Sequence, residues 1–228
     1  APPLERALGA RLLRARHHSL RFEKWALGLL DTHHCMGKAH RMLDDMGKSQ
    51  HVEAALESYL LSERLHESGG ATLTPEERQA VALALRGGFG LALVSHEAWP
   101  GACVPKAPFR PPPAYAAFAA LAARFYAQYP EKPENTRLTT FPMAGCVTLT
   151  KLPSSEEKSA VDIVVTPLQA TILLLFNKTS QLSVAEMAKE CEASLEDTLS
   201  AVRSLAAPSQ QVLVVAAAAP PRGAEEEG

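Results

Sequence analysis

Two pairs of adjacent histidines, one of them followed by a cysteine, are the side chains of this sequence best suited to binding a metal. They are His17–His18 and His33–His34–Cys35, and imidazole with thiolate is a ligand set that suits zinc. Adjacent residues on a helix point about 100° apart, so at most one histidine of each pair can face a shared ion. We therefore expect exposed histidines, with no metal and no cofactor.

Catalysis by a side chain would need a nucleophile or an acid–base pair, and the candidates are poorly placed for either. Cys191 is flanked by Glu190 and Glu192, whose negative charges raise the pKa of a thiol and disfavour the thiolate. Two pairs of adjacent glutamates, at 76–77 and 156–157, fit a helix start and a solvated turn better than an acid–base pair. We expect no catalytic residue and a protein that is not an enzyme.

Charge and composition argue against several further classes of function. The 228 residues are 46% hydrophobic and 21% charged, with a formal net charge of −2. Without a basic excess the chain lacks the field that draws in nucleic acid or anionic lipid, and no apolar run reaches the ~18 residues of a membrane span. The scattered cysteines form no CxxC pair, and the opening APPLERAL has neither a signal core nor a Met. We expect a cytoplasmic or nuclear protein, and a piece of a longer chain.

Apolar residues recur at helical spacing through the first part of the chain, which predicts the end of a helical bundle over residues 1–67. Gly37 and Gly47 are the predicted helix ends there. The stripe begins with Leu4, Leu8, Leu12, Trp25 and Leu29.

Residues 68–88 read as a connector with a short helix of its own. Thr74-Pro75-Glu76-Glu77 supplies an N-cap, a proline at the first helical position and a glutamate at the third. Beyond it, residues 89–165 predict a small α/β domain.

This α/β domain is predicted to hold a strand, a helix and a hairpin. Phe89–Val94 is apolar on both sides, as in a buried strand. An aromatic stripe at helical spacing follows from Ala114. Two alternating runs, 146–152 and 159–165, predict a β-hairpin with a long connection.

Three helix-start signals lie close together after residue 165. Thr166 and Ser183 each begin a capping box, and Ser194 begins a weaker one that ends in Asp197. A β-like run at 210–215 follows, and three helices before a strand are the outline of a winged helix over 166–217. Residues 218–228 are predicted to be a disordered acidic tail. The fold class is α+β: a helical-bundle segment, a small α/β sheet domain and a winged-helix domain.

The charge of the winged-helix segment argues against DNA binding. Its third helix carries Glu196 and Asp197 at the end that would meet bases and phosphates, so counterion release has little to act on. Residues 166–217 hold three cations (Lys178, Lys189, Arg203) and five anions (Glu186, Glu190, Glu192, Glu196, Asp197).

Read in order, several segments resemble the C-terminal core of cullins, the scaffold subunits of RING-type ubiquitin ligases. They are RMLDDMGKS, FGLALVSHEAWP, FRPPPAYAAFAALAARFYAQYP, RLTTFPMAGCVTL and DIVVTPLQATILLLFN, within residues 7 to 215. The wording VTPLQA is also similar to cullin-type subunits of the anaphase-promoting complex. The sequence departs from the pattern at Thr140, where cullins usually carry tryptophan, in the extra 68–88 segment, and in having no matching neddylation lysine.

The resemblance implies a non-catalytic scaffold that docks a RING-box protein, and through it a ubiquitin-conjugating enzyme, without binding nucleic acid or membrane. In cullins a strand of the RING subunit joins the α/β sheet, a case of β-augmentation. The alternatives are a winged-helix protein that binds nucleic acid and a generic helical and winged-helix interaction protein. The implied partner-binding residues are Phe89, Leu91, Leu93, Val94, Trp99, Val147, Leu149, Ile163 and Val165.

Overall fold

The computed structural model describes residues 3–14, 20–31, 36–66, 73–101, 108–133, 138–152, 159–209 and 212–215. The predicted tail at 218–228 lies outside these residues. The protein is α+β, with helices and one two-stranded antiparallel sheet in the described part of the chain. In order, the elements are α1 (Pro3–Arg14), α2 (Leu20–Leu30), α3 (Gly37–His66), α4 (Pro75–Ala84), α5 (Pro113–Gln128), β1 (Val147–Lys151), β2 (Val161–Val165), α6 (Pro167–Leu175), α7 (Val184–Glu190) and α8 (Leu195–Leu205).

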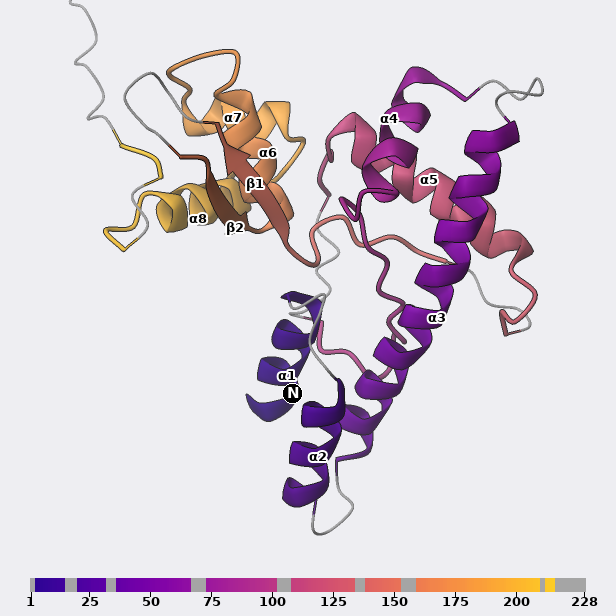
Figure 1. The fold of residues 1–228 in the computed structure, drawn as a ribbon. Helices are drawn as coiled ribbons and strands as arrows, with labels where there is room; N and C mark the ends of the chain where they lie inside the picture. The colour runs from indigo at the N-terminus through magenta and orange to yellow at the C-terminus, as the bar shows by residue number, and fades with distance from the viewer. Residues whose placement is uncertain are drawn as a thin grey trace, which may run out of the picture.

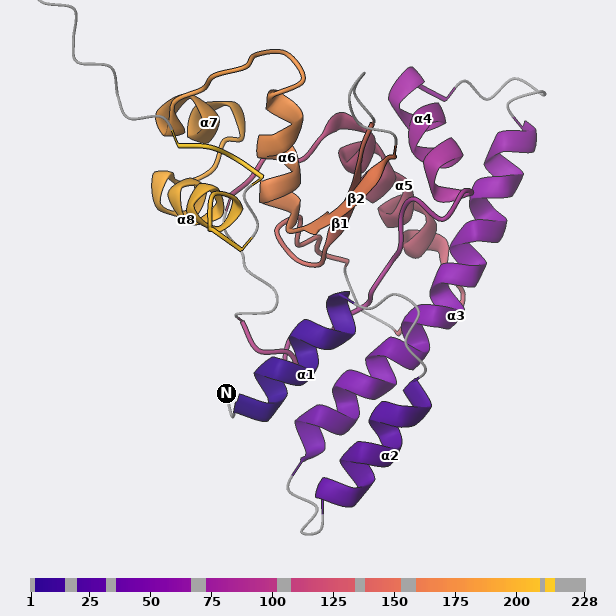
Figure 2. The same cartoon turned by 60° about the vertical axis from the view of Figure 1, so that its left-hand side comes forward.

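The long helix α3 contacts each of the helices α1, α2, α4 and α5. Helices α1 and α2 pack along its first half, and α4 and α5 pack against its second half (Figures 1 and 2). Gly37 begins this helix and Gly47 lies within it, so the prediction that these glycines end helices is wrong. A glycine inside a helix costs about 1 kcal/mol, and buried Leu43 and Leu56 on either side of Gly47 offset that cost.

The apolar stripe predicted for the first helices is only partly buried. Leu8 and Leu12 of α1 and Leu27 of α2 are buried against α3. In contrast, Trp25 and Leu29 are 61% and 60% exposed, on the outer side of α2. A helix with apolar residues on two faces has two faces that could pack inward, and contacts with α3 select the face of Leu27.

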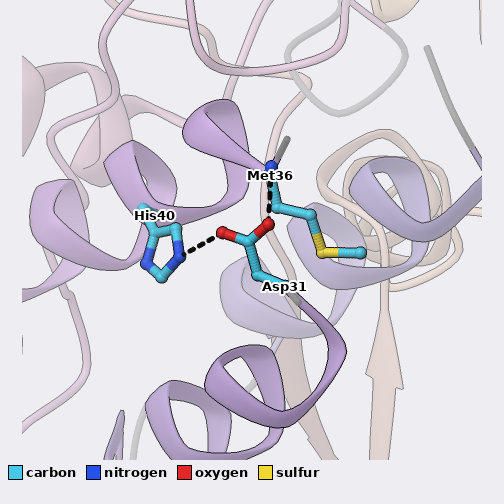
Figure 3. A network of polar contacts seen from close by, with 3 residues as sticks. All are labelled: Asp31, Met36 and His40. Atoms are coloured by element: carbon cyan, nitrogen blue, oxygen red, sulfur yellow. Dashed lines mark hydrogen bonds and ion pairs between the residues drawn. The ribbon is translucent and has the colours of Figure 1, made fainter. Parts of the chain in front are cut away.

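A buried carboxylate holds the junction between α2 and α3 (Figure 3). Asp31 accepts a hydrogen bond from the backbone N–H of Met36, 3.2 Å away, which is one of the unpaired donors at the start of α3. His40, one turn into α3, places its Nε2 3.0 Å from the other Asp31 oxygen. One side chain therefore caps α3 and pairs with its first turn.

Helices α4 and α5 pack on the second half of α3 through an aromatic core. Thr74 forms the predicted capping box with Glu77 at the start of α4, so this prediction is confirmed. From α5, Phe118 and Phe125 are buried between the helices. Phe118 stacks on Phe89 with ring centroids 4.6 Å apart, which ties the start of the following extended segment to this core.

The predicted hairpin is confirmed, as are the three capped helices that follow it. β1 pairs antiparallel with β2, with Val147 opposite Val165 and Leu149 opposite Ile163. Thr166 and Ser183 form capping boxes, and the side chain of Ser194 accepts a hydrogen bond from the backbone N–H of Asp197.

Two predicted strands are absent from the described residues. Phe89–Val94 is extended but joins no sheet, and Val212–Val215 forms no strand either. Val214 is 93% exposed. An apolar, β-prone run becomes a strand only when another backbone pairs with it, and the described part of the chain offers no such backbone to either segment.

Three buried clusters form the interior. The first lies between α1, α2, the start of α3 and Trp99; the second lies between the end of α3, α4 and α5; the third lies between the hairpin and α6, α7 and α8. Helix α3 takes part in the first two, so these share one rigid element.

The capping box of α7 predicts a measurable pH response. Hydrogen bonds from the backbone N–H and then the hydroxyl of Ser183 hold the pKa of the Glu186 carboxyl below its ordinary value. Because the folded-state pKa is lowered, this contribution to stability is present above the unfolded-state pKa and is lost as pH falls through the folded-state value. We expect Ser183→Ala to raise the pKa of Glu186 part of the way to its ordinary value, as measured by NMR titration of the carboxyl carbon.

The matched control is Ser194→Ala, which removes the hydroxyl cap of α8 and should leave the pKa of Glu186 unchanged. An unchanged Glu186 pKa in Ser183→Ala would show that the capping hydroxyl does not contribute.

Candidate functional site

The extended segment 89–95 lies along α3 and takes its hydrogen bonds from side chains of that helix. The backbone N–H of Leu91 donates to Glu53 Oε1 at 3.2 Å, and that of Leu93 donates to Ser49 Oγ at 2.8 Å. The N–H of Ser95 donates to Asp45 Oδ2 at 2.8 Å. Four helical residues rise about 6.0 Å and two extended residues advance about 6.6 Å, so the spacings of helix and segment match over the two steps that join these three hydrogen bonds.

These three hydrogen bonds form a ladder between α3 and the segment, and Asp45 makes the last of them. Its Oδ2 also accepts the hydroxyl of Ser95 at 2.7 Å and the indole Nε1–H of Trp99 at 2.8 Å. Trp99 is only 5% exposed, and a buried indole N–H usually finds a hydrogen-bond partner within the protein. One carboxylate therefore fixes both the end of the segment and the tryptophan that follows it.

The opposite edge of the same segment is open. Successive N–H groups of an extended chain point to opposite sides; those of 91, 93 and 95 face α3, so those of Ala92 and Val94 face away. Within the described residues, neither of these two N–H groups has a hydrogen-bond partner. Segment 89–95 therefore presents one satisfied edge and one edge that a foreign strand could pair with.

The side chains of the nine predicted partner-binding residues face the three cores. Phe89, Leu91 and Leu93 pack against the second cluster, and Val94 packs against the first, where Trp99 is buried. Val147, Leu149, Ile163 and Val165 lie on the face of the hairpin that covers the third cluster. The structure thus brings them to two separate places, and at both of them it is backbone edges that remain accessible.

The hairpin offers a second pair of edges. In the described part of the chain β1 and β2 pair only with each other. Thr150 and Asp162 lie opposite each other in the register and are both exposed, with Thr150 Oγ1 donating to Asp162 Oδ1 at 2.7 Å. This cross-strand bond holds the far end of the hairpin, where the core no longer supports it.

A family model described as the cullin alpha+beta domain matches residues 93–225. The match covers more than half of the chain. The protein belongs to the cullin family. The resemblance drawn from FGLALVSHEAWP onward is thereby confirmed for the extended segment from Leu93, helix α5, the hairpin and the three capped helices. No individual curated protein matches the chain. Cullins are generally non-catalytic scaffolds.

The hydrogen-bonding residues of α3 were missed by the sequence reasoning, which placed a helix end at Gly47. A signal was present: Asp45, Ser49 and Glu53 are polar residues spaced four apart on one helix face. Polar residues so placed are common on solvated faces. Ser49 is only 4% exposed, and only the structure shows what its hydroxyl meets.

A second contact ties this cullin's α5 entry to its C-terminal helices. The backbone N–H of Arg110 donates to the carbonyl of Cys191 at 2.8 Å, and its Nη1 lies 3.0 Å from Glu192 Oε1. Phe109 packs into the third cluster beside them. Glu192 follows α7 with a φ of 49°, a left-handed conformation that usually belongs to glycine at this position.

The described cysteines and acidic residues do not form a reactive centre. Burial, and then the charge of Glu190, raise the pKa of the Cys191 thiol, as its flanking glutamates led us to expect in direction. Among the described residues no cluster of His, Cys, Asp and Glu could hold a metal ion. The histidine pairs at 17–18 and 33–34 and Cys35 lie outside the described residues. No helix in the described ranges is long and apolar enough to cross a membrane.

Removing the Asp45 carboxylate should destabilise the protein. In Asp45→Ala the indole N–H of Trp99 and the backbone N–H of Ser95 both lose their acceptor. We expect the free energy of unfolding to fall by about 3 kcal/mol. Urea denaturation followed by tryptophan fluorescence measures it. Asp44→Ala removes the same charge from the exposed neighbouring position, and we expect a change below about 0.5 kcal/mol. Equal losses in both variants would show that the Asp45 contacts are unimportant.

The left-handed Glu192 allows a double-mutant test of the Arg110 contact. In an Arg110→Ala background, Glu192→Gly should raise the free energy of unfolding by about 1 kcal/mol, because it relieves the left-handed backbone with no ion pair to lose. In the parent chain Glu192→Gly also removes the exposed ion pair with Arg110. The increase in the free energy of unfolding should therefore be smaller there, by up to about 1 kcal/mol. Urea denaturation of the four proteins gives both values.

Glu190→Gly serves as the control, since it places glycine in the helical part of α7 and should cost about 1 kcal/mol. If Glu192→Gly destabilises the protein in both backgrounds, the backbone cost assigned to Glu192 is wrong.

Proposed function

We propose that this cullin is a non-catalytic scaffold of a RING-type E3 ubiquitin ligase and that it docks a RING-box subunit. Family membership supports the general role. The scaffold holds a substrate receptor and the RING subunit at a set distance, so that the ubiquitin-conjugating enzyme recruited by the RING meets its target at high effective concentration. This work takes place in the cytoplasm or nucleus.

The observation that carries the docking proposal is the open edge of segment 89–95. A strand of the RING-box protein would add beside Gly90, Ala92 and Val94, with backbone hydrogen bonds supplying affinity. The ladder to α3 keeps the segment extended before the partner arrives, and this lowers the entropy cost of binding. The half-buried side chains of Phe89, Leu91 and Leu93 hold the same segment against the second core.

We further propose that α6, α7 and α8 form a winged helix that contacts protein rather than nucleic acid. The N-terminal turn of α8 carries Glu196 and Asp197, and that of α7 carries Glu186. Carboxylates at these positions complement the helix dipole but repel phosphate. The contacts of Arg110 with Cys191 and Glu192 support a role for these helices in holding the segment that leads into α5.

A proline on the open edge tests the docking surface. Ala92→Pro removes the N–H that points away from α3 and leaves the donors of Leu91 and Leu93 in place. We expect Ala92→Pro to weaken the affinity for a RING-box protein at least about tenfold, seen as loss of co-elution in size-exclusion chromatography. The reason is the loss of one to two interfacial hydrogen bonds and a clash between the proline ring and an added strand.

Ala92→Ser is the matched control, because it keeps the N–H and a small exposed side chain, and it should bind as the parent does. Circular dichroism and urea denaturation of Ala92→Pro establish that it folds. If a folded Ala92→Pro binds like the parent, the partner does not use this edge, and the hairpin becomes the docking surface to test. If the folded parent chain binds no RING-box protein, the scaffold proposal fails.

A further inference from the structure

A small pocket opens where α3, the end of α4 and the start of segment 89–95 meet. Its volume is about 120 Å³. Leu56 and Leu60 of α3, with Phe89 and Phe118, make its lining largely apolar. The pocket lies on the α3 side of the segment, away from the open edge described above.

Two glutamates of α3 stand at this apolar pocket. Glu53 and Glu57 are one helical turn apart and both line it. Glu53 is held in place because its Oε1 accepts the N–H of Leu91 at 3.2 Å. Glu57 is exposed, and its carboxylate has no hydrogen bond or ion pair within the described residues. Arg86 precedes Gly87, which also lines the pocket. The side chain of Arg86 makes no ion pair in the described part of the chain either.

An apolar floor beside two carboxylates fits a side chain that is itself apolar along its stem and cationic at its tip. A purely apolar group would desolvate the carboxylates without compensation. A guanidinium stacks on aromatic rings and donates to carboxylates in a fixed fork, which an ammonium cannot do. Three methylenes of an arginine stem cover apolar surface while the charged head stays at the rim.

We infer that this pocket binds an arginine side chain presented by a partner protein. The stem lies against Leu56 and Leu60, the guanidinium lies near Phe89, and Glu57 with the free oxygen of Glu53 accepts its N–H groups. The inference is independent of the RING-box proposal, because it uses the other side of segment 89–95 and needs no added strand.

Two small probes test the site in the 228-residue chain. Acetyl-arginine methylamide carries the guanidinium, and acetyl-citrulline methylamide has nearly the same shape without the charge. In a titration followed by ¹⁵N–¹H NMR, we expect the arginine probe to shift the amides of Glu57, Gly87 and Leu91 in a saturable way with millimolar affinity, and the citrulline probe to bind at least about tenfold more weakly, since it forms no charge-assisted bond.

Glu57→Gln supplies the decisive variant, because it removes an exposed, unpaired charge and leaves the Glu53–Leu91 bond intact. We expect about fivefold weaker binding of the arginine probe. Glu76→Gln, which changes the same charge on the exposed first turn of α4 outside the pocket, should bind like the parent chain. Equal binding of the two probes, an unaffected Glu57→Gln, or equal loss in both variants would each overturn the assignment.

Discussion

The hydrogen bonds from one face of α3 to segment 89–95 are the constraint on which the rest of the candidate site depends. An extended backbone must satisfy its N–H groups, and here Asp45, Ser49 and Glu53 do so in place of a neighbouring strand. A helix can take this role because four of its residues rise nearly as far as two extended residues advance. The consequence is asymmetry, since one edge of the segment is satisfied and the other is not.

The same helix joins parts of the protein that are distant in sequence. α3 contributes to the first and second buried clusters, so a partner that binds segment 89–95 binds a surface backed by both. The third cluster is joined to the α5 entry through Arg110 and Phe109. Burial of apolar surface supplies most of the stability, whereas the polar contacts decide how the segments are oriented.

A scaffold needs rigid placement of its docking surfaces more than it needs reactive side chains. Of the apolar residues first considered for partner contact, Trp99 and Val165 are buried and the other seven are half-buried. The docking surface proposed for this cullin is backbone that a well-packed interior leaves exposed. The half-buried side chains of Phe89, Leu91 and Leu93 hold this backbone against the second cluster.

The sequence alone determined the features that depend on neighbours in the chain. The capping boxes at Thr74, Thr166 and Ser183 join residues three apart, and the hairpin follows from alternation in two adjacent runs, so each prediction was confirmed. Only the tertiary structure decided whether Phe89–Val94 would be a strand and which face of α2 would be buried. Both outcomes depend on partners far away in sequence: the apolar pattern says that a segment is extended or that a helix face can pack, but the fold alone decides what lies beside it.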